Sequence, residues 1–376
     1  MTIRNRIAWS NTRILTVIAG AILLAALIGM LFIRDTAIDT DITSKTTNVG
    51  LVLSNTREDA NYCQTHYDSL MNLKDELNLE IFCREKIMEN EDCFDAMKEL
   101  IEEDRCSIII APSFGYAPYV KEMAVLYPDI CFIQPMGTGA LPNMTTCSGR
   151  MYQARYLSGI VAGMHSRTAE IGYVAAFAIP EVVGQINAFT LGVRSVAADA
   201  AVHVIYCNSW VDDAEAEKAS KALLDMYPEV DMLTMHTNSL MPNRVAKDRG
   251  ISSIGFNRDN AELFPGSWLT ACVWNWEDYY RQKITSSLQG KFYGRHEWVD
   301  MEDGIIKLSE LTEECVPGTK ERVDEAAGRF KNRSFDVFYG PVFDNTGRLR
   351  VPEKESMSDE MLNSIDWYVE GVTVEE

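Results

Sequence analysis

Five short apolar runs in the middle of the chain have the length and composition of buried β-strands. They are Ile171–Phe177, His203–Trp210, Met232–Asn238, Ser253–Asp259 and Leu269–Trp276. Helix-like stretches separate the early runs, among them Val182–Val196 and Asp212–Tyr227. Strands that alternate with helices form a parallel sheet covered on both faces. The pattern therefore predicts an α/β fold.

Each of these runs ends in aromatic, amide or acidic side chains. The carboxyl ends of parallel strands meet at one edge of the sheet, and ligands bind there. We therefore expect one rim to carry Phe177, Trp210, His236, Asn238, Asn257, Asp259, Trp274 and Trp276. Flat aromatic faces bordered by amides suit a planar heteroaromatic ligand better than an ion or a sugar.

A similar series of strands and helices precedes this one. Strand-like runs occur at Asn48–Ser54, Leu79–Cys83, Ser107–Ala111 and Ile130–Gln134, before an amphipathic helix at Tyr152–His165. Two such units without repeated sequence predict two doubly wound lobes with a cleft between them. We expect the first lobe from residues 47–167 and about 277–303, and the second from 168–276 and about 304–376.

The end of the chain changes in character. Asp336–Tyr339 and Leu349–Val351 flank Asp344–Gly347, whose sequence is typical of a tight turn. We expect a hairpin appended to the second lobe.

The first 34 residues have the pattern of a membrane segment. Arg4, Arg6 and Arg13 precede the uncharged run Ile14–Ile33, which Arg34 closes. About 20 apolar residues span a bilayer, and flanking arginines stay in the cytoplasm. We therefore expect an N-terminal transmembrane anchor over residues 1–34, with a cleaved signal as the alternative, and a polar tether over 35–46. Everything after the anchor would lie outside the cytoplasm, in extracellular or periplasmic space.

Net charge and cysteine content indicate which partners and which cysteine chemistry to expect. A net charge of −20 argues against a nucleic-acid partner, whose phosphates would be repelled. Nine cysteines without a C-x-x-C pair are read as buried free thiols.

Motifs for catalysis, cofactors and metals do not occur in the sequence. The five histidines include no H-E-x-x-H pair, and no P-loop, G-x-S-x-G or G-x-G-x-x-G follows a strand. Asp212 and Asp213 form a carboxylate pair, but their place before a helical stretch indicates helix capping. We expect neither an enzyme nor a cofactor or metal site.

Several segments resemble the basic membrane protein family, the substrate-binding proteins of ABC transporters that import nucleosides and purines. The resemblance is carried, in chain order, by Gly149–Gly159, Ile171–Glu181, Ile186–Gly192, Asn208–Asp213, Gly255–Asp259, Val273–Trp276 and Asp366–Val372. It implies the type I periplasmic-binding-protein fold, two α/β lobes joined by a hinge. It also implies ABC permease and ATPase subunits as partners.

The resemblance bears on the ligand as well. Nucleoside-binding members carry an acid where Asn257 stands and a lysine where Trp274 stands, and these two residues hold the ribose. Their replacement resembles the branch that binds a free purine base, with adenine favoured. The ligand contacts expected on this basis are Tyr62, Phe114, Tyr152, Phe177, Trp210, His236, Asn238, Asn257, Asp259 and Trp274.

Three other functions compete with capture of a purine base. One is binding of a purine nucleoside, and another is a membrane-tethered domain that senses a ligand for a partner. The segment before Ile14 is too short for a cytoplasmic output domain, which favours transport. The third, a nucleoside hydrolase, lacks a carboxylate cluster.

Overall fold

The computed structural model describes residues 45–375, which contain two mainly parallel sheets. The six-stranded sheet has the order β11-β5-β4-β3-β1-β2. Its strands are β1 (Thr47–Val52), β2 (Leu79–Arg84), β3 (Ile108–Ile110), β4 (Cys131–Pro135), β5 (Met144–Gly149) and β11 (His296–Val299). We call this sheet and the helices packed on it the first lobe.

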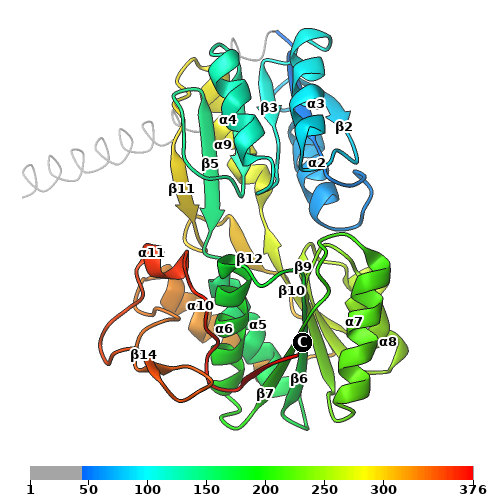
Figure 1. Ribbon diagram of the computed structural model, residues 1–376, viewed down its shortest axis with the longest axis vertical. Coiled ribbons are helices and arrows are strands. Elements are labelled where there is room, and N and C mark those ends of the chain that lie inside the picture. Colours follow the sequence, from blue (N-terminus) through cyan, green and yellow to red (C-terminus); the bar gives the residue numbers. More distant parts are fainter. Residues whose placement is uncertain (1–44, 376) are drawn as a thin grey trace, which may run out of the picture. The chain divides into compact units, whose positions relative to one another are not determined.

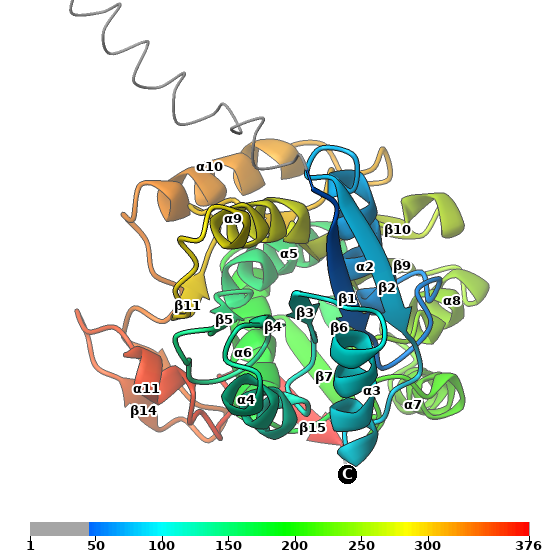
Figure 2. The same ribbon diagram turned by 90° about the horizontal axis from the view of Figure 1, so that it is seen from above.

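Helices cover both faces of the first sheet. They are α2 (Tyr62–Leu73), α3 (Glu91–Glu102), α4 (Ala117–Leu126) and α9 (Trp276–Leu288). Helix α2 packs against α9 and helix α3 against α4. Figure 2 shows these two pairs on opposite sides of the strands. The α/β arrangement predicted from the alternating runs is therefore confirmed for this sheet.

The second lobe contains a seven-stranded sheet with the order β12-β10-β9-β8-β6-β7-β15. Its strands are β6 (Glu170–Ala175), β7 (Ala201–Tyr206), β8 (Met232–His236), β9 (Ser252–Asn257), β10 (Trp268–Trp274), β12 (Ile306–Leu308) and β15 (Val372–Glu375). Every pair in it is parallel except β10 with β12. The five runs singled out in the sequence are its five central strands, because their β-branched and apolar residues fit a sheet buried on both faces.

The helices of the second lobe are arranged in the same way. They are α5 (Tyr152–His165), α6 (Pro180–Arg194), α7 (Asp213–Met226), α8 (Met241–Asp248) and α10 (Thr319–Lys331), with the short 3₁₀ helix η1 (Ala261–Leu263) after β9. Helix α7 packs against α8. Helix α5 packs against α6 and against α10, so it lies in the second lobe and not in the first, where residues up to 167 were expected. The Asp212 carboxylate accepts hydrogen bonds from the main-chain N–H of Ala214 (2.9 Å) and Glu215 (3.1 Å), so the predicted capping of α7 is confirmed.

The chain passes between the two lobes three times. The links are the stretch from β5 to α5, the turn from β10 into α9, and the loop from β11 to β12. Figure 1 shows β11 and β12 where the two lobes meet. Three short links between two packed bodies are the usual construction of a hinge.

Trp276 does not lie at the rim. It was expected on a strand there, but it is the first residue of α9 and is fully buried, because the chain turns at Asn275.

The expected hairpin is present, but its first arm differs from the prediction. It forms between β13 (Val342–Phe343) and β14 (Leu349–Val351), so its first arm is not Asp336–Tyr339. The Asp344 carboxylate accepts the main-chain N–H of Thr346 (2.9 Å) and Arg348 (3.0 Å), and this turn places the arms next to it.

After the hairpin, the chain forms the short helix α11 (Asp359–Leu362) and then β15, which extends the second sheet beside β7.

The nine cysteines all lie in the described residues and are free. Seven are buried, while Cys83 and Cys315 are half-buried. Between residues 45 and 375, no helix combines the length and the apolar character needed to cross a membrane. The expected anchor and tether, residues 1–34 and 35–46, lie outside the described residues, apart from the last two residues of the tether.

Close contact between α5 and α6 gives a test of the packing in the second lobe. A Cβ added at Gly192 would lie 2.0 Å from the main-chain oxygen of Tyr156, whereas one added at Gly328, in α10, would meet nothing within 4 Å. We predict that G192A lowers the free energy of unfolding by roughly 1–3 kcal/mol, because the two helices must move apart. The control G328A should raise it by up to about 1 kcal/mol. Urea denaturation measures both, and equal effects would contradict the assigned packing.

Candidate functional site

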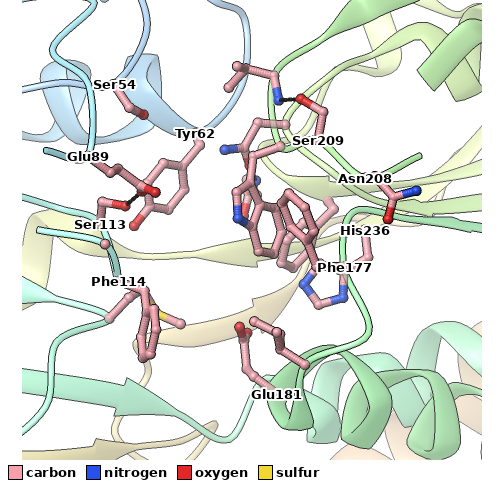
Figure 3. Close-up of a pocket in the computed structure, with 18 of the residues that line it drawn as sticks. Ser54, Tyr62, Glu89, Ser113, Phe114, Phe177, Glu181, Asn208, Ser209 and His236 are labelled. Atoms are coloured by element: carbon pink, nitrogen blue, oxygen red, sulfur yellow. Dashed lines mark hydrogen bonds between the residues drawn. The ribbon is translucent and has the colours of Figure 1, made fainter. Parts of the chain in front are cut away.

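A cavity of about 390 Å³ lies between the lobes, and both sheets contribute to its walls (Figure 3). Each segment that lines it comes at or just after the carboxyl end of a strand. Side chains from the loops after β1, β2, β3 and β4 face those from the loops after β6, β7, β8, β9 and β10. In the first sheet β1 lies between β2 and β3, and in the second sheet β6 lies between β7 and β8. The strand order changes direction at β1 and at β6, and ligands of such sheets bind next to this point.

Aromatic rings from the second lobe form one wall. The ring of Phe177 meets that of Trp210 edge to face at 5.7 Å, Trp210 lies 5.9 Å from His236, and His236 lies 4.4 Å from Phe256. The first lobe contributes Tyr62, which is buried, and Phe114, whose side chain is 64% exposed. A flat ligand would therefore find ring faces on both sides of the cavity.

Trp274 lines the cavity and is held from behind by other rings. Its indole stacks on that of Trp276 at 4.7 Å, with 14° between the planes. Trp276 in turn stacks on His66 at 4.8 Å, and His66 Nδ1 hydrogen-bonds the Tyr280 hydroxyl at 2.6 Å. Burial lowers the pKa of His66 well below its usual value, so this stack is uncharged. Trp274 is thus a fixed plate rather than a mobile side chain.

Two buried polar atoms at the cavity have no hydrogen-bond partner among the described residues. Asn257 Nδ2 donates to Asn238 Oδ1 (3.0 Å), but Asn257 Oδ1 accepts nothing, and the Tyr62 hydroxyl is likewise unpartnered. An unsatisfied buried polar group costs roughly 1–3 kcal/mol. Both side chains line the cavity, so a ligand that reaches either atom would remove this cost.

The backbone is strained at the same place. Asn257 has φ +68°, Asn208 +54° and Met136 +62°, all in the left-handed region that non-glycine residues rarely adopt. All three line the cavity. Such conformations cost on the order of 1–3 kcal/mol and gather at ligand sites.

The charges that line the cavity are acidic. Glu89 and Glu181 contribute carboxyl groups, and the Ser113 hydroxyl donates to Glu89. Within residues 45–375, no lysine or arginine lines the cavity. His236 is neutral, because burial and then the nearby Arg155 cation lower its pKa well below the usual value. Burial raises the pKa of the Glu181 carboxyl to about 7, against the opposing effects of Arg155 and of the hydrogen bond from Gln185.

Hydrogen bonds join the lobes around the rim of the cavity. Asn61 Nδ2 donates to the main-chain oxygen of Asn238 (2.8 Å), and Asn260 Nδ2 donates to that of Ala60 (2.9 Å). Arg258 of the second lobe pairs with Asp68 of the first. The structure is therefore a closed arrangement of the two lobes.

The structure brings together eight of the ten residues expected at the site. They are Tyr62, Phe114, Phe177, Trp210, His236, Asn238, Asn257 and Trp274. Tyr152 lies elsewhere, because its hydroxyl accepts from Arg150 (2.9 Å) and its ring packs on Phe338. Asp259 is exposed, and its Oδ1 accepts the main-chain N–H of Ala261 (3.1 Å) at the start of η1.

The two acidic residues of the cavity were not expected. Glu181 closes the motif Ile171–Glu181 and follows β6, so its position after a strand was a usable signal. Glu89 follows the edge strand β2 within a stretch rich in acidic residues, where nothing distinguishes it from a solvated surface. In residues 45–375, no group of three or more His, Cys, Asp or Glu side chains could hold a metal ion.

Comparison with known proteins agrees with this geometry. Residues 46–331 match the family model described as PnrA-like ABC transporter substrate-binding protein (Bmp). The chain is 32% identical over 288 residues to a purine-binding protein of Brucella abortus, covering 77% of this chain and 81% of that relative. It is 33% identical over 266 residues to a putative ABC transporter glucose-binding protein of Haloferax volcanii, covering 70% and 65%.

Solved structures show the same fold. An ABC transporter solute-binding protein from Aeropyrum pernix superposes with a TM-score of 0.68, covering 85% of this chain and 96% of that one at 13% identity.

The raised pKa of Glu181 gives a test of the cavity's electrostatics. The pKa lies above the ordinary value of 4.5, so the protonated acid stabilises the fold, and this stabilisation is lost as the pH rises from about 4.5 through 7. We predict that E181Q raises the free energy of unfolding by roughly 1–3 kcal/mol above pH 7 and leaves it unchanged near pH 4. Urea denaturation across that range measures the difference, and a difference that does not vary with pH would contradict this reading.

Proposed function

This chain belongs to the family of PnrA-like ABC transporter substrate-binding proteins, and we propose that it captures a purine base, adenine above others, in the cavity between its lobes. Members of this family are not enzymes; they bind small ligands and work with a permease and an ATPase. The similarity to a purine-binding protein supports the proposed ligand class.

The observation that carries the proposal is a cavity lined both by aromatic rings and by two side chains with unpartnered polar atoms. The side chains of Asn257 and Tyr62 line the cavity together with Trp210, Phe177 and Trp274, and each holds one buried polar atom without a hydrogen-bond partner among the described residues. Adenine has two faces that stack on such rings and an edge that carries an amino donor and ring-nitrogen acceptors. Its edge would satisfy both atoms while its faces contact the rings.

The side chains that line the cavity suit a free base better than a nucleoside. A ribose needs polar partners for its hydroxyl groups, and the positions expected to supply them hold the Asn257 amide and the apolar Trp274 plate. Binding of a nucleoside remains the alternative.

Ligand capture would favour the closed arrangement. A base held by Tyr62 from the first lobe and by Trp210 and Asn257 from the second contacts both at once. A ligand shifts a conformational equilibrium by its difference in affinity for the two states, and only the closed state offers both walls. The hydrogen bonds of Asn61 and Asn260 across the rim would add to the stability of that state.

The family and the N-terminal sequence both support a proposal for the cellular setting. Substrate-binding proteins of this kind act outside the cytoplasm. We propose that Ile14–Ile33 anchors the chain in the membrane with both lobes outside, next to the permease.

Two substitutions test the binding site directly. We predict that W210A and N257G each weaken adenine binding tenfold or more, because each removes one stacking or polar contact. Glycine is chosen at position 257 because it tolerates the φ of +68° found there. The control is Y293A, at an exposed tyrosine outside the cavity. Calorimetry with adenine, adenosine and glucose measures the affinities, and tighter binding of adenosine or glucose than of adenine would refute the proposal.

The absence of cations among the lining residues predicts how the protein treats nucleotides. A phosphate group would enter a cavity that holds Glu89 and Glu181 and has no lysine or arginine on its walls. We predict that adenosine monophosphate binds at least 100-fold more weakly than adenine at about pH 8. Competition calorimetry measures the ratio, and affinities within tenfold of each other would contradict the assigned electrostatics.

A further inference from the structure

A line of buried polar side chains lies behind the Glu181 carboxyl. Gln185 Nε2 donates to Glu181 Oε1 (2.7 Å), and Gln185 Oε1 accepts from Arg155 Nε (3.2 Å). Arg155 Nη2 donates to the main-chain oxygen of Met235 (3.0 Å). Arg155 is 0% exposed and Gln185 2%, so bulk water does not hydrate either side chain. The line therefore runs from the core of the second lobe to the cavity.

Arg155 is a buried cation without a directly paired carboxylate in the described part of the chain. Its guanidinium lies 4.2 Å from the centre of the Phe256 ring and 5.5 Å from that of Tyr173, and Nη1 has no hydrogen-bond partner. Burial of an unpaired charge costs several kcal/mol. Gln185 connects Arg155 to the carboxyl group of Glu181. The positive charge of Arg155 favours the ionised form of that carboxyl group.

The carboxyl group of Glu181 is left half free by these contacts. It stands in the first turn of α6 and points into the cavity (Figure 3). Gln185 occupies Oε1, which leaves Oε2 for another donor. Acidic residues are common in the first turn of a helix, where they face the helix dipole. That role alone needs no buried glutamine and arginine behind the side chain.

We propose that Glu181 determines specificity in this cleft, with Oε2 accepting a hydrogen bond from an N–H group of the bound base and with Gln185 and Arg155 as positioning residues. The inference rests on the proposed function and names its ligand class more closely. Glu181 Oε2 and Asn257 Oδ1 are both acceptors, so the cavity selects a neutral, donor-bearing amino-purine. A site built to hydrogen-bond a ligand group rejects analogues that lack the group.

The first experiment compares three ligands by calorimetry with the wild-type chain and with E181Q. Adenine carries both an amino group and a ring N–H at position 9, 6-methylpurine lacks the amino group, and 9-methyladenine lacks that ring N–H. We expect E181Q to bind adenine about tenfold more weakly, because a charged acceptor is replaced by a neutral one. One of the two analogues should bind both proteins within twofold, which identifies the donor that Glu181 accepts.

Other outcomes separate the two proposals. If the wild-type chain binds no purine, the proposed function fails and this inference with it. If it binds adenine but E181Q changes nothing, or weakens all three ligands equally, only the role of Glu181 is overturned. The control E122Q, at an exposed carboxyl on α4, should leave all three affinities unchanged.

A second experiment tests the positioning role of Gln185 by a pH profile. Three titratable groups interact electrostatically with Glu181: Arg155 from α5, Tyr173 from β6 and Tyr62 from α2. His236 from β8 and Glu89 line the same cavity. His236 is already neutral, so it adds no titration in the window of interest.

Adenine affinity should rise as the pH increases through about 7, because the ionised carboxylate is the better acceptor. In Q185L the midpoint should move to higher pH, because the hydrogen bond that lowers the pKa of Glu181 is gone. A purely structural effect would lower the affinity without moving the midpoint, and an unmoved midpoint overturns the positioning role.

Discussion

Parallel pairing is the constraint on which the rest of this structure depends. A parallel strand needs a crossover to reach its neighbour, so all the parallel strands of a lobe end on the same edge, and the loops that follow them begin there. Two lobes built in this way, with their carboxyl edges facing, bring nine separate loops to one cavity. Residues as distant in sequence as Ser54 and Trp274 meet for this reason. The site is therefore a property of the topology, and the side chains only decide what it holds.

The chemistry of the cavity follows from which charges are placed at its surface and which behind it. The walls carry ring faces, amides and two carboxyl groups, while Arg155 lies behind them, buried in the core of the second lobe. Among the described residues, this division keeps lysine and arginine out of the lining while two carboxyl groups remain in it. Neutral molecules with hydrogen-bond donors suit such a surface, whereas phosphates and carboxylates do not.

Much of this arrangement could be predicted from the sequence. The central strands of the second sheet are β-branched apolar runs, and their closing residues reach the cavity because strand ends share one edge. The site residues that were predicted wrongly depend on the direction that the chain takes after a strand. Trp276 follows Trp274 at the spacing of a strand, but a turn into α9 sends it into the core. Asp259 caps η1 instead of facing the cavity, and Glu89 required the fold itself to bring it there.

The stacked pair of Trp274 and Trp276 has a further consequence. One indole ends a strand of the second lobe and the other begins a helix of the first, with only Asn275 between them. Any rotation of one lobe against the other must change the overlap of two rings that now lie 14° from coplanar. The fluorescence of an indole depends on the contacts of its ring. The intrinsic fluorescence of this tryptophan pair should therefore change when the lobes open or close, and Trp274 also lines the cavity where the ligand would bind.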